Sequence, residues 1–376
     1  MAPQVRQVTT RADLRRFVRV PGQLAADDPH WVEPLMMERL GVLSPKQNPL
    51  FEHAEAAHFI AEDDGRILGR ISAVMDRLAP QADGGLIVGH FGMIDARDHA
   101  ALSALFATAE TWLKDRGAQV VRGPFSLSIN EITGLLIDGF DTAPFVMMDH
   151  HAPWLGDAVE RQGYSKAKDT VAYLLDLTVP LPDKERRVID RPWPGLVVRN
   201  LNPKAYAQEI ATITDVFNDA WAGNWGFAPL TEAETAAMAR DLKPILDPGL
   251  VKIAELDGQP AAFLVLLPNI NEAIADLGGR LLPFGWARLL WRLKVSGVKT
   301  GRVPLMGVRR EVAATMAGKL LPLRLIYAVD ADARARGIEE IEMSWLLEDN
   351  WPIRRMVEGL GGRLSKTYRV YEKTLA

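Results

Sequence analysis

Short hydrophobic runs alternate along this chain with stretches of helical spacing, in an order that predicts both strands and helices. In the first half, His58–Ala61 and Ile67–Met75 flank the turn sequence Asp63-Asp64-Gly65, which predicts a β-hairpin. Asp98 is placed to cap a helix that ends at Gly117 and whose apolar residues recur on one face. The other predicted elements of this half are strands at Leu86–Ile94, Val120–Leu127 and Thr170–Leu177 and a helix at Pro153–Gln162.

The second half repeats this order. A hairpin turns at Asp257-Gly258, and a helix ends at Gly337. The other elements expected there are strands at Arg302–Val308, Ile338–Leu347 and Lys366–Lys373 and a short helix at Pro352–Gly359. Each half is thus a hairpin, a third strand, a helix, a fourth strand, a helix and a closing strand. This order predicts an α/β fold in which helices cover both faces of a mixed sheet.

The two halves also share short stretches of sequence. Ile60-Ala61-Glu62 returns as Ile253-Ala254-Glu255. Two further matches follow in the same order: Arg116-Gly117 and Asn130 with Arg336-Gly337 and Asn350, then Val159-Glu160, Gly163, Lys168 and Tyr173 with Val357-Glu358, Gly361, Lys366 and Tyr371. Three collinear matches indicate a tandem duplication. We therefore expect an N-terminal domain at 1–178, a linker rich in proline and charge at 179–195, and a C-terminal domain at 196–376.

Composition and charge disfavour several classes of function. With 48% hydrophobic and 24% charged residues, the chain is typical of a soluble globular protein. Its net charge of −4 disfavours nucleic acid as a partner. The absence of cysteine excludes disulfides, thiolate nucleophiles and cysteine metal ligands, and it fits a reducing cytoplasm. We expect no signal peptide at Met1–Val20, and the longest apolar run, Ala261–Leu267, is far too short to span a bilayer.

The end of the second half resembles a known family. Glu348-Asp349-Asn350 closes a predicted strand, and a short helix, Gly361 and Tyr371 follow. This arrangement resembles the GNAT acyltransferases, and its duplication resembles their tandem members, such as N-myristoyltransferases and Fem-type transferases. The resemblance implies acyl-CoA or an acyl carrier protein as donor, with no metal or cofactor tightly bound. It also implies that the donor lies where the third and fourth strands of a half separate, with its phosphates at the next helix N-terminus.

The two halves differ at this expected donor site. Arg309 and Arg310 follow the third strand of the second half, whereas Asp95-Ala96-Arg97-Asp98 follows that of the first. Guanidiniums attract a pyrophosphate and carboxylates repel it, so we expect the C-terminal half to bind the donor and the N-terminal half to be degenerate. The family's glycine-containing phosphate loop is imperfect after Arg310, and the alternative is that both arginines are solvated. The expected donor-binding residues are Gly307, Val308, Arg309, Arg310 and Asn350.

Acyl transfer to an amine needs a base for the amine and an acid for the departing thiolate. Glu348, at the end of the fourth strand of the second half, is the expected base, and Ser128 stands at the matching place in the first half. The alternative is that Glu348 caps the helix that begins at Pro352. The resemblance implies a tyrosine acid on that helix, which contains none, so we expect Tyr368 on the next strand to substitute.

Residues ahead of the second hairpin suit an acceptor with a long apolar body and a polar head. The resemblance places the acceptor pocket on the early helices of a GNAT-like half. The expected acceptor-binding residues are Asn218, Trp221, Asn224, Trp225 and Phe227, joined by His151 from the first half. The alternatives are that the aromatic residues fill the core, that the asparagines cap turns and that His151 is structural. A glycine-rich apolar segment at 133–140 is also a candidate wall for an acyl tunnel.

The segment from Leu277 to Arg310 contains eight lysines or arginines and no acidic residue. Within it, Leu282–Val295 predicts an amphipathic helix with Arg288 and Arg292 opposite its apolar face. That face is formed by Leu282, Trp286, Leu289, Leu290 and Leu293. An anionic membrane surface attracts a basic amphipathic helix of this kind. The alternative is a helix that covers the core and keeps its arginines in water.

The assembled pattern also looks like the bacterial ceramide synthases, through Asn218-x-x-Trp221-x-x-Asn224-Trp225-Gly226-Phe227 and Trp345-Leu346-Leu347-Glu348-Asp349-Asn350. The resemblance implies N-acylation of a sphingoid base, sphinganine or 3-oxosphinganine, by a long-chain acyl-CoA. Three alternatives stay open: another amine as acceptor, a non-catalytic double-GNAT protein that binds a lipid or thioester, and a Fem-like transferase that uses aminoacyl-tRNA. We expect a cytoplasmic protein, with peripheral contact at the inner face of an anionic inner membrane left open.

Overall fold

A computed structural model describes residues 3–375 and divides the chain into two compact units. Unit 1 consists of Met1–Thr170, Ile274–Leu282 and Lys366–Ala376, and unit 2 consists of Val171–Ala273 and Pro283–Ser365. Two long strands, β7 (Ser165–Asp176) and β13 (Arg363–Thr374), contribute residues to both units. The predicted domain boundaries at 178 and 196 stay a prediction about the duplicated halves, since the compact units are interleaved along the chain.

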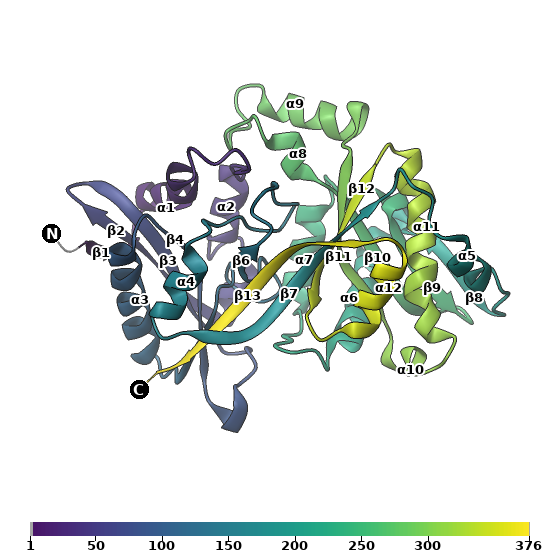
Figure 1. Cartoon of the computed structure of the whole chain (residues 1–376), viewed down its shortest axis with the longest axis horizontal. Coiled ribbons are helices and arrows are strands. Elements are labelled where there is room, and N and C mark those ends of the chain that lie inside the picture. Colours follow the sequence, from purple (N-terminus) through teal and green to yellow (C-terminus); the bar gives the residue numbers. More distant parts are fainter. Residues whose placement is uncertain (1–2, 376) are drawn as a thin grey trace. The chain divides into compact units, whose positions relative to one another are not determined.

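Unit 1 is built on a mixed sheet (Figure 1) with strand order β1-β2-β3-β4-β5-β13, and β6 also pairs with β13. Only β4 and β5 pair in parallel among these described strands. The β2–β3 hairpin turns at Asp64 and Gly65, both of which have positive φ, so the turn residues meet the conformational demand that the sequence predicted. The strands are β1 (Gln4–Gln7), β2 (Ala54–Asp63), β3 (Arg66–Asp76), β4 (Val88–Ala96), β5 (Val120–Gly123) and β6 (Leu135–Asp138).

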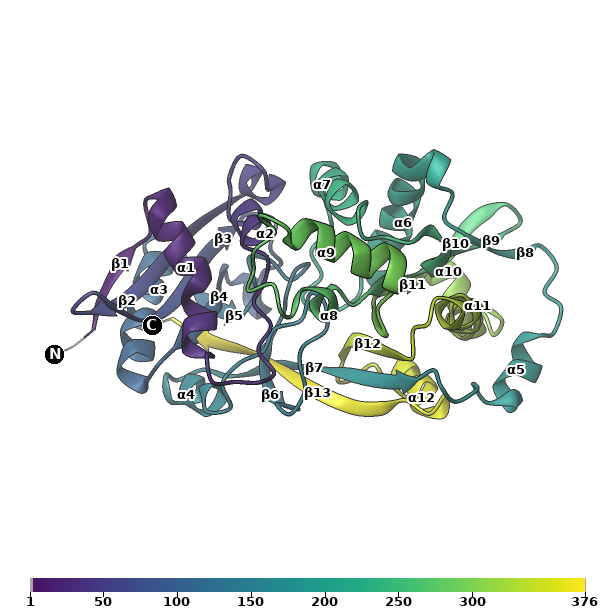
Figure 2. The same ribbon diagram turned by 90° about the horizontal axis from the view of Figure 1, so that it is seen from above.

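Helices cover both faces of this sheet. α3 packs on the face that carries Phe59 and Phe91, whereas α1 and α2, which lie side by side in Figure 2, pack on the face that carries Ile60 and Val74. Asp98 caps α3 as predicted, since its Oδ1 accepts the backbone N–H of Ala101 at 2.9 Å. The helices are α1 (Arg11–Leu24), α2 (Met36–Val42), α3 (His99–Lys114) and α4 (Leu155–Arg161), with 3₁₀ turns at Pro49–Glu52 and Asp83–Gly85.

Unit 2 repeats the plan with strand order β7-β12-β11-β10-β9-β8. β11 and β12 are parallel, and the pairs from β11 to β8 are antiparallel. Asp257 and Gly258 form the β9–β10 turn with positive φ. The strands are β8 (Leu196–Asn200), β9 (Val251–Leu256), β10 (Gln259–Pro268), β11 (Thr300–Val308) and β12 (Glu340–Leu347).

The unit 2 sheet is also covered on both sides, by α11 on the face that carries Leu264 and Val303 and by α6 on the opposite face (Figure 2). Its α-helices are α5 (Asp183–Ile189), α6 (Tyr206–Trp221), α7 (Glu232–Leu242), α8 (Ile270–Ile274), α9 (Gly285–Trp291), α10 (Arg310–Ala313), α11 (Leu321–Ala335) and α12 (Trp351–Gly359). A π turn lies at Arg292–Ser296, and 3₁₀ turns lie at Pro203–Ala205, Pro248–Leu250 and Gly318–Leu320.

The α/β class and the predicted order of elements are confirmed, with local differences. β5 ends at Gly123 rather than at Leu127, because Pro124 supplies no backbone N–H to extend the ladder. The extra segment of the first half forms β6, which pairs with β13. The predicted linker contains α5, and its buried Leu181 and Ile189 join the core of unit 2, so part of this charged segment is ordered by apolar anchors.

Candidate active site

In unit 2, the third and fourth strands of the repeat separate. The parallel ladder of β11 and β12 begins with Thr300 opposite Glu340 and ends with Val303 opposite Met343. The next residue of β11, Pro304, has no backbone N–H, and the register between β10 and β11 shifts at the same place. β11 therefore continues along β10 while β12 diverges from it, at the place where the GNAT resemblance implied the acyl donor.

Aromatic side chains lie against β12 where it leaves the ladder. The rings of Trp345 and Trp221 have centroids 5.6 Å apart in an edge-to-face arrangement. Phe217 lies 4.9 Å from Trp221 and 5.8 Å from Phe227. The structure thus brings two predicted acceptor residues, Trp221 and Phe227, to the separation of the strands, and it adds Phe217 and Trp345.

The predicted asparagines have mainly structural contacts. Oδ1 of Asn218 accepts the backbone N–H of Leu230 at 3.2 Å, and its Nδ2 donates to the Leu230 carbonyl at 3.5 Å. These bonds close the loop between α6 and α7. They fit the alternative that Asn218 stabilises a turn. The Asn224 carbonyl accepts the backbone N–H of Phe227 at 3.2 Å, and Trp225 is half-buried. A role of Asn224 and Trp225 in acceptor binding stays a prediction.

Arg309 and Arg310 are paired with two acids of α6 that no sequence pattern had indicated. Nη2 of Arg309 donates to Asp215, and Nε and Nη2 of Arg310 each lie 3.3 Å from Oδ1 of Asp219. The backbone N–H of Arg310 donates to Oδ2 of Asp219 at 2.8 Å. A carboxylate therefore holds the N–H that was expected to meet a donor phosphate. The available sequence signal was the spacing of four residues between Asp215 and Asp219, which places both on one face of a helix.

The other predicted donor residues lie on the same strands and on the following helix. Gly307 and Val308 are the last residues of β11 and pair with Phe263 and Ala262 of β10. A Cβ added to Gly307 would lie 2.9 Å from the Phe263 ring, so glycine permits close packing there. Asn350 is the N-cap of α12.

Glu348 follows the last residue of β12 and is half-buried. Its carbonyl accepts Nη1 of Arg354 at 2.5 Å, and Nε of Arg354 donates to the Tyr173 hydroxyl at 3.0 Å. That hydroxyl donates to Oε1 of Glu358 at 2.6 Å, and burial raises the pKa of Tyr173. α12 thus holds the backbone at Glu348, whereas Tyr173, which matches Tyr371 in the repeat, has a structural role.

A buried ionic network lies at the last pairs of the β11–β12 ladder. Nε of Arg302 donates to Oγ of Ser344 at 2.7 Å and lies 3.7 Å from Oε1 of Glu342. Oγ of Ser344 in turn donates to Oε1 of Glu342 at 2.5 Å. The Arg302 side chain is 3% exposed and that of Glu342 is 0% exposed. Nη2 of Arg302 also donates to the Ser344 carbonyl at 3.2 Å, so the network holds the first β12 residue beyond the ladder.

In unit 1 the corresponding place is filled by backbone. β4 and β5 pair in parallel as far as His90 and Arg122. The backbone N–H of Phe125 then donates to the Phe91 carbonyl at 2.9 Å, and a Cβ added to Gly92 would lie 1.5 Å from the Phe125 carbonyl oxygen. The chain therefore crosses β4 at contact distance where an extended donor would need space.

Tyr368 and His151, predicted as acid and acceptor contact, belong to unit 1, whereas Glu348 belongs to unit 2. Tyr368 is fully buried and pairs with Leu136 of β6. Nδ1 of His151 accepts the backbone N–H of Leu136 at 3.2 Å, and its Nε2 lies 3.8 Å from Asp149. These contacts fit a structural role for His151, which was the alternative, and the functional roles of both residues stay predictions.

Glu131 of unit 1 is a titratable group that no sequence pattern had indicated. Burial raises the pKa of its carboxyl to about 7, although the nearby Arg39 guanidinium opposes this shift. Nη1 of Arg39 donates to Oγ of Ser126 at 3.4 Å, and its other nitrogens pair with Glu38. A carboxyl that titrates near neutrality is a candidate functional group.

The predicted basic helix differs from its expected form. It begins at Gly285 instead of Leu282, because Pro283 disfavours helical backbone at the residue before it. Nη1 of Arg292 donates to the Ala273 carbonyl at 2.7 Å, so this arginine turns towards the protein. Trp286 and Trp291 are 51% and 61% exposed, which is unlike a helix that covers a core.

Two features are absent from residues 3–375. No group of three His, Asp or Glu side chains there is arranged to hold a metal ion. The same residues include no helix that is both long and apolar enough to cross a membrane.

The fold of the chain matches that of solved GNAT structures. A tandem GNAT protein from the clavulanic acid biosynthesis pathway superposes with a TM-score of 0.58 and 13% identity, over 99% of this chain and 98% of that one. A GCN5-related N-acetyltransferase from Sphaerobacter thermophilus superposes with a TM-score of 0.54 and 15% identity, over 99% of this chain and 96% of that one. Together with the separated strands of unit 2, these matches define a protein of the tandem GNAT fold.

Comparison with curated proteins is more specific. The chain is 50% identical over 370 residues to the bacterial ceramide synthase of Caulobacter vibrioides, covering 98% of this chain and 96% of that protein. It is 45% identical over 373 residues to the protein YghO of Escherichia coli K12, covering 99% and 95%. No family model matches the chain. The chain belongs to the bacterial ceramide synthase family.

Proposed function

We propose that this chain is an N-acyltransferase that moves a long-chain acyl group from acyl-CoA to the amine of a sphingoid base, sphinganine or 3-oxosphinganine. Its 50% identity to a bacterial ceramide synthase carries the proposal. In the reaction, the amine nitrogen forms an amide bond to the acyl carbonyl carbon, and the bond from that carbon to the CoA sulfur breaks. The neutral amine loses a proton as the amide forms, and the departing thiolate takes one up.

We assign the donor to unit 2. β11 leaves β12 after Val303, so its remaining residues present an edge along which an extended pantetheine chain can lie and pair with backbone groups. In unit 1 the crossing backbone at Phe125 opposes this use of the corresponding strands. Near Arg310, the donor phosphates would replace the Asp219 carboxylate at the backbone N–H. Donor binding then exchanges one anion for another, with Arg309 and Arg310 released to bind phosphate.

Glu348 is the proposed base in unit 2. A sphingoid amine is an ammonium ion in neutral water, so the Glu348 carboxylate both attracts it and accepts its proton before attack. The backbone contact with Arg354 restricts the position of this residue. Trp221, Trp345 and Phe227 supply apolar surface for the acceptor chain near the separated strands. The proton for the departing thiolate comes from the solvent or from the protonated Glu348.

We also propose peripheral contact with a membrane through α9. Lipid amines and long acyl chains partition into membranes, so the enzyme must meet them at that surface. α9 and its flanks expose large apolar residues that water contacts unfavourably in the free protein. They are Phe284, Trp286, Leu290, Trp291 and Val295, with exposed fractions between 46% and 78%.

The first experiment measures thiol release from palmitoyl-CoA by the purified chain, with and without sphinganine, and identifies the lipid product by mass. The proposal expects release that depends on sphinganine and an N-acylated product. Release with other amines but not with sphinganine would show that the acceptor is a different amine. Binding of palmitoyl-CoA with no turnover across a panel of amines would instead favour the non-catalytic alternative.

The role of Glu348 is tested by Glu348→Gln, with Asp349→Asn as the matched control on the neighbouring exposed carboxylate. Loss of a positioned base lowers kcat by roughly 10²–10⁴-fold. We expect a loss in this range for Glu348→Gln, KM for palmitoyl-CoA within a few-fold of wild type, and little change for the control. Full activity in Glu348→Gln would show that another group accepts the proton.

A further inference from the structure

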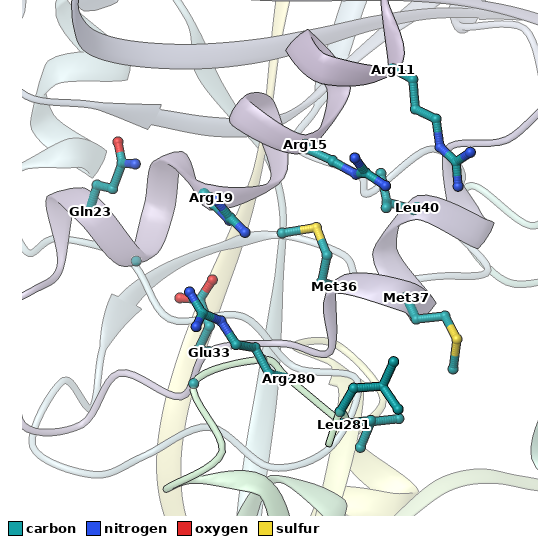
Figure 3. A pocket seen from close by; sticks show the side chains of 14 residues that line it. Arg11, Arg15, Arg19, Gln23, Glu33, Met36, Met37, Leu40, Arg280 and Leu281 are labelled. Carbon is teal, nitrogen blue, oxygen red and sulfur yellow. The ribbon is translucent and has the colours of Figure 1, made fainter. Parts of the chain in front are cut away.

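A pocket of about 740 Å³ in unit 1 combines a row of arginines with an apolar floor. Arg11, Arg15 and Arg19 project from one side of α1, and Arg280 reaches the pocket from the 278–282 segment (Figure 3). Their spacing of four residues on a helix places the three α1 arginines in one line. The apolar lining residues are Met36, Met37, Leu40, Leu281 and Leu282.

The charges of this row are not neutralised by the part of the chain that the structure describes. Arg16, between two of the arginines in sequence, pairs with Asp13 and Glu62, whereas within residues 3–375 the guanidiniums of Arg11, Arg15 and Arg19 form no ion pair or hydrogen bond. Like charges four residues apart destabilise a helix by a few tenths of a kcal/mol per pair. The row therefore has an energetic cost that an anionic ligand would offset.

One carboxylate, Glu33, is present among the described lining residues, against four guanidiniums. Its Oε2 accepts Nε1 of Trp31 at 2.9 Å, and Arg280 points towards it in Figure 3. The net charge of the pocket is therefore positive, and it disfavours the ammonium group of a sphingoid base. The ligand that fits must be an anion with an apolar part.

We propose that this pocket binds the phosphate-bearing head group of an anionic phospholipid at a membrane surface. Guanidiniums bind phosphate oxygens through paired hydrogen bonds, and the methionine and leucine side chains suit the first methylene groups of the lipid. Met37 and Leu282 at the lining are 71% and 80% exposed. A bilayer covers such side chains, whereas a small soluble anion leaves them in water, and this difference favours a lipid in its membrane.

The pocket proposal deepens the proposed function. It rests on that function because it assumes a substrate that lies in a membrane. It is independent of α9 as an observation, because its lining residues lie in unit 1, whereas α9 and its exposed apolar side chains lie in unit 2. Anionic head groups would select membranes of negative surface charge, and apolar contacts would add affinity for any bilayer. Recognition of lipid charge is thus assigned to the arginine row.

The test is flotation of the full chain with vesicles of phosphatidylcholine alone and with vesicles that also contain phosphatidylglycerol. The pocket variant is Arg15→Gln/Arg19→Gln, and the control is Lys46→Gln/Lys114→Gln, which removes the same charge from exposed positions of unit 1 outside the pocket lining. Each cationic residue near an anionic surface contributes roughly a fivefold gain in binding. We expect about a 30-fold loss of binding to the anionic vesicles for the pocket variant and less than a threefold loss for the control.

Equal losses in the two double variants would overturn the proposal, because general charge attraction would then explain binding. Calorimetric titration with free CoA and with inorganic phosphate separates a soluble ligand from a lipid. If either ligand binds wild type and loses affinity in the pocket variant while flotation is unchanged, the pocket takes a soluble anion and the lipid assignment is wrong. Far-UV circular dichroism verifies that both variants fold.

Wild-type acyl transfer in detergent micelles is measured separately. A wild type that acylates sphinganine but floats independently of the arginine row would contradict the pocket proposal alone. A wild type that recognises anionic vesicles through this row but transfers no acyl group would contradict the proposed function alone.

Discussion

Replacement of Arg302 by methionine tests the buried network beside the separated strands of unit 2. Arg302→Met keeps much of the side-chain volume but removes the positive charge that faces Glu342 in a site where both side chains are almost fully buried. At the 3.7 Å separation of Nε and Oε1, Coulomb's law gives about 4.5 kcal/mol for an effective dielectric constant of 20. Breaking a buried pair from one side costs roughly 3–5 kcal/mol, in agreement with this value.

The double variant Arg302→Met/Glu342→Leu removes the carboxylate together with its partner. Replacement of a whole buried ion pair by apolar residues is often close to neutral, and the Ser344 hydroxyl that bonds to both groups adds a cost of about 1 kcal/mol. We therefore expect the double variant to lie within about 2 kcal/mol of wild type and to be more stable than Arg302→Met. Glu342→Leu alone removes the carboxylate that faces the Arg302 guanidinium, and its cost should resemble that of Arg302→Met.

The free energies of unfolding come from urea denaturation followed by tryptophan fluorescence, with the slopes compared among the variants. Arg302 also bonds to the Ser344 carbonyl, so its loss should loosen β12 beyond the ladder and raise KM for palmitoyl-CoA more than it lowers kcat. A cost below 1 kcal/mol for Arg302→Met, or a double variant less stable than either single variant, would refute this account of the network.

Three further outcomes are expected. Folding raises the pKa of the Glu131 carboxyl from 4.5 to about 7, so between these pH values the folded state binds a proton that the unfolded state does not. The free energy of unfolding should therefore fall by up to about 3 kcal/mol as the pH rises through this window. Glu131→Gln should flatten this slope in urea denaturation at several pH values. Gly92→Ala should lower the free energy of unfolding by roughly 3 kcal/mol, because its Cβ meets the Phe125 carbonyl. Its control, Gly359→Ala, has open space in a helix and should be neutral or stabilising. Equal shifts of the melting temperature in the two variants would contradict the backbone crossing at Gly92. Asp219→Asn should tighten CoA binding roughly fivefold in calorimetry, and unchanged affinity would place the phosphates away from Arg310.

The pattern of the sequence was sufficient for the order of elements, because that order depends on local periodicity and on turn residues. The Asp64-Gly65 and Asp257-Gly258 hairpins and the Asp98 cap formed as expected, since each needs only neighbouring residues. The helix boundary near Pro283 was misjudged because its apolar spacing received more weight than the proline. The C-terminal part of β13 pairs with β5 of unit 1. Local patterns do not encode this pairing, because the two strands are far apart in the sequence.

The candidate site was predictable in part. Trp221, Phe227 and Glu348 lie in the unit that carries the separated strands, where the GNAT resemblance implied acceptor and base, and their roles stay predictions. The pairing of Asp219 with Arg310 was not predictable from one strand and its loop, because the acid comes from a helix far away in sequence.

The sequence alone determined that this protein is a duplicated α/β chain without cysteine chemistry, and that the loops after the third strands of its two halves differ in charge, since repeats, turns and residue types are local properties. Only the tertiary structure decided which strands separate, which charges are neutralised and which arginines around the pocket of unit 1 have no ionic partner among the described residues. These properties depend on side chains brought together by packing, and burial and charge pairing exist only after the chain has folded.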